Sequence, residues 1–157
     1  MNPKTIKEEL KKLIESYKLP NLEALDREIE IVDLLSERRE MPQDMISTIR
    51  RRFTEAIYSW INFVHSLIIP NPQSIISNKD AEAFSDKEKE DIYKIMAVLA
   101  GMTRESTSFE AKKGKAKEEA KFISDNFPKY LEIKKDLAKL NEKIAAYWQK
   151  EAESKQP

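Results

Sequence analysis

Five polar side chains recur at helical spacing in a segment that we predict to be a helix over residues 42–68. Their positions step by four and three residues, which places them on one face. They are Arg51, Glu55, Tyr58, Asn62 and His65, the single histidine of the chain. Glu55 could act as a base, Arg51 could hold an anion and His65 could transfer protons. We favour the plainer interpretation, the polar edge of an amphipathic helix.

Two basic clusters are candidates for binding phosphate or nucleic acid. They are Arg50, Arg51 and Arg52 in that helix, and Lys112, Lys113, Lys115 and Lys117 around Gly114. Successive helical residues point about 100° apart, so we expect at least one arginine to pair with an acid instead of facing a phosphate. The lysine turn is the better anion candidate, because a glycine turn exposes backbone N–H groups. Neither cluster carries interleaved aromatic residues, so solvated charge is the favoured interpretation.

Metal chemistry has less support. The chain has no cysteine and one histidine, which excludes cysteine-ligated zinc and the paired Glu-x-x-His motifs of di-iron bundles. Two carboxylate pairs, Glu37 with Glu40 and Glu88 with Asp91, each lie about one helical turn apart and could hold Mg²⁺. The arrangement is similar to the acidic motifs of the all-α nucleotide pyrophosphohydrolases, and that resemblance implies a nucleotide hydrolase. Here residues 41–87 separate the pairs, whereas that family keeps its motifs on consecutive helices with a short interval. We predict no metal and no cofactor.

The elements that position these residues are helices. Two glycines in 157 residues cannot supply the turns of a sandwich or barrel, so we predict an all-α bundle of five to six helices. We expect a single domain over residues 1–151 and a frayed tail over 152–157. Zero net charge disfavours a DNA-coating protein, and the apolar stretch 56–69 is too short to span a bilayer. We therefore expect a soluble, cytoplasmic protein. Its abundant Lys, Glu and Ile are typical of proteins from thermophiles, which favours a thermophilic source.

Apolar periodicity predicts the first three helices. They are expected over residues 3–18, from a cap at Asn21 to near Glu40, and from Pro42 to the end of the apolar stretch. Residues 41–78 carry few charges, so the third helix is expected at the centre of the bundle with Trp60 buried. The proline-containing segment 69–84 is expected to be a long connection. Its apolar residues Ile75, Ile76 and Phe84 should pack back onto the bundle.

Capping signals predict where helices begin and end in the second half of the chain. Ser85 and Glu88 match a capping box, and the helix that follows should continue to a glycine cap at Gly114. Gly101 inside this helix suggests a close helix crossing. Pro128 should kink the next helix or make it restart, and a final helix should end near Glu151.

These observations favour a non-enzymatic domain for helix-mediated protein–protein association with an unidentified partner. Homodimerisation through leftover apolar surface such as Trp148 stays open. The first alternative function is that of a nucleic-acid-associated accessory protein that uses the basic clusters. The second is a magnesium-dependent nucleotide hydrolase. No nucleophile elbow, glycine-rich phosphate loop or zinc-binding helix motif occurs, which disfavours the common enzyme classes.

Overall fold

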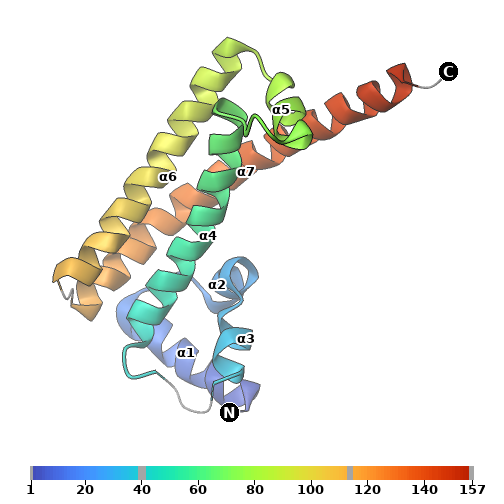
Figure 1. The fold of residues 1–157 in the computed structure, drawn as a ribbon. Coiled ribbons are helices and arrows are strands. Elements are labelled where there is room, and N and C mark those ends of the chain that lie inside the picture. Colours follow the sequence, from blue (N-terminus) through green and yellow to red (C-terminus); the bar gives the residue numbers. More distant parts are fainter. Residues whose placement is uncertain (1, 39–41, 113–114, 156–157) are drawn as a thin grey trace. The chain divides into compact units, whose positions relative to one another are not determined.

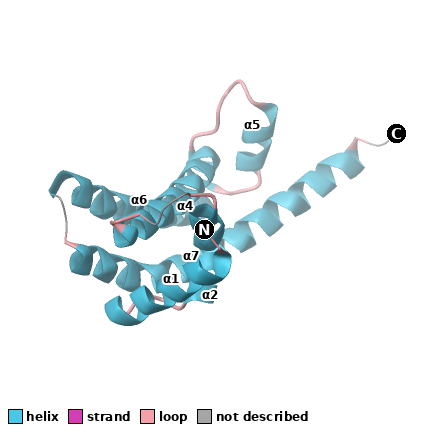
Figure 2. Cartoon of the chain, turned by 90° about the horizontal axis from the view of Figure 1, so that it is seen from below, coloured by secondary structure: helices cyan, strands magenta, loops and turns pink. Residues whose placement is uncertain are grey.

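The computed structural model describes residues 2–38, 42–112 and 115–155. These residues form helices joined by loops, with no strand among them, which confirms the all-α prediction (Figure 2). Seven helices follow one another along the described chain (Figure 1). They are α1 (Pro3–Tyr17), α2 (Leu22–Ile29), α3 (Ile31–Ser36), α4 (Met45–Ile68), α5 (Ile75–Glu82), α6 (Asp86–Lys112) and α7 (Ala116–Ser154). None of the described helices is long and apolar enough to cross a membrane.

The chain divides into two compact units. Met1–Tyr58 and Met102–Lys129 form the first, and Ser59–Gly101 and Tyr130–Pro157 form the second. Helices α1, α2 and α3 belong to the first unit and α5 belongs to the second, while α4, α6 and α7 each contribute residues to both. The single domain expected over residues 1–151 stays a prediction.

The second predicted helix is wrong in its extent, because α2 ends at Ile29. Glu30 adopts a left-handed conformation with φ 51° and donates its N–H to the Asp26 carbonyl, which closes α2. The Asp26 carboxylate then accepts the Val32 N–H at 2.9 Å, so it caps the short helix α3. The first helix agrees with its prediction: the Asn2 side chain caps it by accepting the Lys4 N–H.

Helix α4 contributes to the core of each unit, as its sparse charge predicts. It begins at Met45, three residues after the proline that was expected to open it. In the first unit the Phe53 ring, fully buried, contacts the rings of Phe122 and Phe127 on α7. In the second unit Val64 and Leu67 belong to a buried cluster. The expected full burial of Trp60 is wrong: the indole is only partly buried at the border of that cluster.

The segment 69–84 is a long connection between α4 and α6, as predicted, but it contains the helix α5, which the sequence did not predict. The Ser74 hydroxyl accepts the Ser77 N–H and caps α5, a local signal within a proline-containing stretch. Phe84 is buried as expected. Ile75 and Ile76 do not pack back: they are 78% and 67% exposed. The reason is that α5 is held to α7 by polar contacts of its other residues, which include Trp148 Nε1 donating to Asp80 at 2.7 Å.

The capping box that opens α6 is confirmed. Ser85 N donates to the Glu88 carboxylate at 3.1 Å, and Glu88 N donates to the Ser85 hydroxyl at 3.2 Å. The close helix crossing predicted at Gly101 is wrong, because a methyl group placed on Gly101 would meet no atom within 4 Å. The predicted cap at Gly114 lies outside the described residues.

Helix α7 continues through Pro128, so of the predicted kink or restart the restart is wrong, and the kink stays a prediction. A proline inside a helix loses one backbone hydrogen bond and costs about 3 kcal/mol. Phe127 and Tyr130, on either side of it, are almost fully buried. Their packing outweighs that local cost, and α7 runs on to Ser154.

Candidate functional site

The arginine cluster of α4 lies in the first unit, where Arg50 is the largest fully buried side chain. Only 2% of this side chain is exposed. Its Nε donates to Glu119 on α7 at 3.3 Å, and its Nη2 donates to Glu110 on α6 at 2.6 Å. The remaining nitrogen, Nη1, donates to the carbonyl and the hydroxyl of Ser106 at 3.0 and 2.9 Å. The guanidinium therefore joins three helices through its hydrogen bonds.

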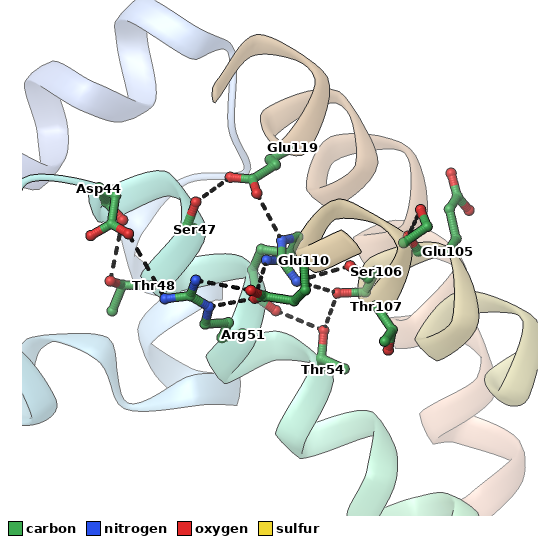
Figure 3. A network of polar contacts seen from close by, with 12 residues as sticks. Asp44, Ser47, Thr48, Arg51, Thr54, Glu105, Ser106, Thr107, Glu110 and Glu119 are labelled. Atoms are coloured by element: carbon green, nitrogen blue, oxygen red, sulfur yellow. Dashed lines mark hydrogen bonds and ion pairs between the residues drawn. The ribbon is translucent and has the colours of Figure 1, made fainter. Parts of the chain in front are cut away.

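The partners of Arg50 are themselves hydrogen-bonded, so the buried charge is compensated. Glu119, with 4% of its side chain exposed, also accepts a hydrogen bond from Ser47 (Figure 3). The Ser106 hydroxyl lies 2.5 Å from that of Thr54, which donates to the Arg50 carbonyl. Among the described side chains no buried polar atom lacks a hydrogen-bond partner. This satisfied network has the character of a structural element.

Arg51 lies between two carboxylates, as Figure 3 shows. Its Nε and Nη2 donate to Glu110 at 2.5 and 3.1 Å, and its Nη1 is 3.8 Å from Asp44. The hydrogen bonds from Arg51, and then those from Arg50, lower the pKa of Glu110 to about 2. Glu110 therefore stays ionised over the physiological pH range.

Arg52 turns to a different side of the helix. Its Nε donates to the carbonyl of Ile29 at 2.9 Å, and its Nη1 donates to Glu55 at 3.1 Å. All three arginines thus engage carboxylates, which confirms the expectation that at least one would. A phosphate at this cluster would have to compete with these carboxylates for the guanidinium groups.

The polar stripe of α4 is exposed at all five positions. Arg51, Glu55 and Tyr58 line a shallow pocket of about 260 Å³ in the first unit, together with Ser106, Thr107 and Glu110. Asn62 and His65 belong to the second unit. The favoured interpretation, a polar helix edge, stays a prediction, and a catalytic role stays its untested alternative.

The lysine turn and the carboxylate pairs fall at helix ends. Lys112 ends α6, and Lys115 and Lys117 flank the start of α7; all three are exposed, and no described carboxylate pairs with them. Glu88 is occupied by its capping bonds and by an ion pair with Lys143, and Asp91 pairs with Lys94 at 3.8 Å. Lys113 and Glu40 lie outside the described residues, and Glu37 follows the end of α3. Among the described residues no group of three His, Asp or Glu side chains could hold a metal ion.

The sequence reasoning missed the residues that complete the arginine cluster. Glu110, Glu119 and Ser106 lie more than fifty positions from Arg50 along the chain. No local spacing signals such a pairing, although a rare arginine in an apolar helix is itself a hint that a buried acid exists elsewhere.

Three isoleucines of the second unit are exposed, and two of them, Ile75 and Ile76, were expected to pack onto the bundle. Ile69, Ile75 and Ile76 are 64%, 78% and 67% exposed, and we name them the isoleucine surface. The chain between them is ordered by hydrogen bonds: Asn71 N donates to the Ser77 hydroxyl, and Asn78 Nδ2 donates to the carbonyls of Asn71 and Ser74. The isoleucine surface therefore lies on a fixed support.

Comparison with known proteins gives no relative. A scan against protein-family models, a search of curated proteins and a search of solved structures each found no match. The function is therefore inferred from the site residues alone.

Proposed function

We propose that this chain is a non-enzymatic protein–protein interaction domain that associates through the isoleucine surface. The supporting observation is the exposure of three isoleucines within eight residues, on a segment held by side-chain hydrogen bonds of Ser74, Ser77 and Asn78. Isolated exposed apolar residues are common in soluble proteins, but a group of them is typical of an interaction site. A rigid support reduces the conformational entropy lost on binding.

The occupant that we propose for the isoleucine surface is a second copy of the chain. The three exposed fractions amount to about two whole isoleucine side chains, and fully burying one contributes about 1.5–3 kcal/mol. A two-fold dimer buries the same surface from both copies. The burial therefore contributes a favourable free energy of about 6–12 kcal/mol, which opposes an association cost of about 4–15 kcal/mol. Within this range a weak, concentration-dependent dimer is expected.

Two observations make the competing functions less favoured. Arg50, Arg51 and Arg52, one of the two basic clusters that a nucleic-acid accessory protein would use, engage carboxylates within the chain, which leaves the lysine turn as its only candidate among the two. Glu88, which a magnesium-dependent hydrolase would use, is bound by Lys143 and by the backbone at Ser85.

Sedimentation velocity over a concentration series tests the proposal. The wild-type mass is expected to rise from 18.3 kDa towards twice that value as the concentration increases. The double variant Ile75→Ser with Ile76→Ser should remain at 18.3 kDa, and its fold should persist because both side chains are exposed.

Val98→Ser serves as the matched control. Val98 is another exposed apolar residue of the second unit, and it lies outside the isoleucine surface. Its replacement should leave the dimer unchanged. A wild-type mass of 18.3 kDa at every concentration, or an equal loss of dimer in Val98→Ser, would contradict the proposal.

A further inference from the structure

A recess of about 290 Å³ in the first unit is lined by three arginines. One wall is formed by Asp44, just before α4, and by α4 residues from Thr48 to Glu55; the other is formed by Leu34 of α3 and Arg38 just after it. The lining residues are Leu34, Arg38, Asp44, Thr48, Arg51, Arg52 and Glu55. These side chains carry three positive and two negative charges.

Each of the three guanidinium groups keeps N–H donors that no described carboxylate hydrogen-bonds. Arg51 Nη1 is 3.8 Å from Asp44, and Arg52 Nη2 is 4.0 Å from Glu30. Both distances exceed the length of a hydrogen bond. In the part of the chain that the structure describes, no hydrogen bond or ion pair engages the Arg38 side chain, which is exposed.

Two of these guanidinium groups are fixed from behind. Glu110 holds Arg51 through its Nε and Nη2, and the Ile29 carbonyl holds Arg52 through its Nε. A ligand that met the remaining N–H groups would therefore lose little side-chain entropy in ordering them. Glu110, which is not part of the lining, thus positions the free edge of Arg51 and neutralises part of its charge.

We propose that this recess binds a small phosphate monoester, with the phosphate oxygens accepting hydrogen bonds from Arg38, Arg51 and Arg52. Planar guanidinium groups match the oxygens of a phosphate group in two-point hydrogen bonding. Asp44 and Glu55 lie in the same lining and would accept hydrogen bonds from hydroxyl groups of the ester. Such a ligand matches the charges of the lining, because its anionic phosphate group would meet the arginines and its neutral hydroxyl groups would meet the carboxylates.

The two carboxylates argue against a nucleic acid as the ligand. A polyanion continues past any single phosphate, and its neighbouring phosphates would meet Asp44 and Glu55, which are 62% and 66% exposed. A small ester presents only one phosphate. This inference does not depend on the isoleucine surface, which belongs to the second unit.

Calorimetric titration with glycerol 3-phosphate, and separately with inorganic phosphate, tests the proposal at constant ionic strength set by chloride. The ester is expected to bind saturably and more tightly than inorganic phosphate, because only the ester offers hydroxyl donors to the carboxylates. Arg38→Gln should weaken ester binding about tenfold, as expected for the loss of one charge-assisted donor group. The thermal midpoint should hardly change, since Arg38 is exposed and unpaired among the described residues.

Two further variants test how the charge of the lining affects binding and whether binding takes place in the recess. Glu55→Gln removes one negative charge and one carboxylate acceptor from the lining, so it should tighten the binding of inorganic phosphate and narrow the preference for the ester. Arg104→Gln is the matched control: Arg104 is an exposed arginine of the same unit, outside the recess and without an ion pair to a described residue. It should leave ester binding unchanged.

Three results would overturn the proposal. The first is the absence of saturable ester binding above the effect of chloride. The second is an equal effect of Arg38→Gln and Arg104→Gln. The third is binding of nucleic acid alone, with a steep salt dependence that Arg38→Gln leaves unaltered.

Discussion

Replacing Arg50 with methionine tests the buried ion network, because methionine keeps much of the side-chain volume and removes the charge. Glu119 would then lie buried without its guanidinium partner and with only the Ser47 hydroxyl as a donor. Breaking a buried ion pair from one side costs about 3–5 kcal/mol, mainly from the uncompensated charge. Glu110 would contribute less, since its side chain is 44% exposed and keeps Arg51. We expect the free energy of unfolding to fall by about 3–5 kcal/mol.

The double variant Arg50→Met with Glu119→Gln separates the lost charge from lost packing. Its neutral amide no longer requires a counter-charge, so most of the stability should return. Arg52→Met is the control at a neighbouring, partly exposed arginine and should cost about 1 kcal/mol, as for a surface ion pair and one hydrogen bond. Urea denaturation followed by circular dichroism measures all three. The reasoning is refuted if Arg50→Met costs no more than Arg52→Met, or if Glu119→Gln restores nothing.

Three further predictions use the same assay. Gly101→Ala should stabilise the protein by about 0.5–1 kcal/mol, since the added methyl group meets open space and alanine favours the helix; a loss would reveal a contact at that position. Phe53→Ala should cost about 3–5 kcal/mol and Trp60→Ala less, because Phe53 is fully buried and Trp60 is not; equal costs would contradict this order. Because the folded-state pKa of Glu110 is lowered, its stabilising contribution is present above the ordinary value of 4.5 and is lost as the pH falls towards about 2. Glu110→Gln should therefore lose less stability than wild type across that acid range, and parallel losses would exclude the Arg51 and Arg50 hydrogen bonds as the cause.

The sequence predicts the elements whose signals are local. The Ser85–Glu88 capping box and the caps at Asn2 and Asn21 mark helix starts that the structure has at the same residues. The apolar periodicity of residues 46–67 correctly predicts a long helix with buried residues in both units. Such signals depend only on residues that are close in the sequence, so they can be recognised before the fold is known.

The features that the sequence did not predict depend on distant contacts or on side-chain competition. The break at Glu30 arises because the Asp26 carboxylate stabilises a new helix start, an interaction that periodicity does not register. The continuity of α7 at Pro128 depends on tertiary burial of Phe127 and Tyr130. Ile75 was assigned to the core by its hydrophobicity, but α5 is held to α7 by polar contacts instead.

The pairing of Arg50 with Glu119 is the largest gap between sequence and site. The chain has 28 acidic residues, and nothing local distinguishes the one that meets this guanidinium. Burial of the arginine could be expected in principle, because Arg50 follows the fully buried Ile49 in the apolar helix α4. The identity of its partner required the fold.

Association of two copies through the isoleucine surface is tested most directly by amide NMR spectra over a concentration series. If two copies associate through this surface, signals of residues 69–78 should shift or broaden progressively as the protein concentration rises, while signals of the first unit stay constant. The same residues in the variant Ile75→Ser with Ile76→Ser should show no concentration dependence. Spectra that do not change with concentration, or changes confined to other residues, would contradict the account.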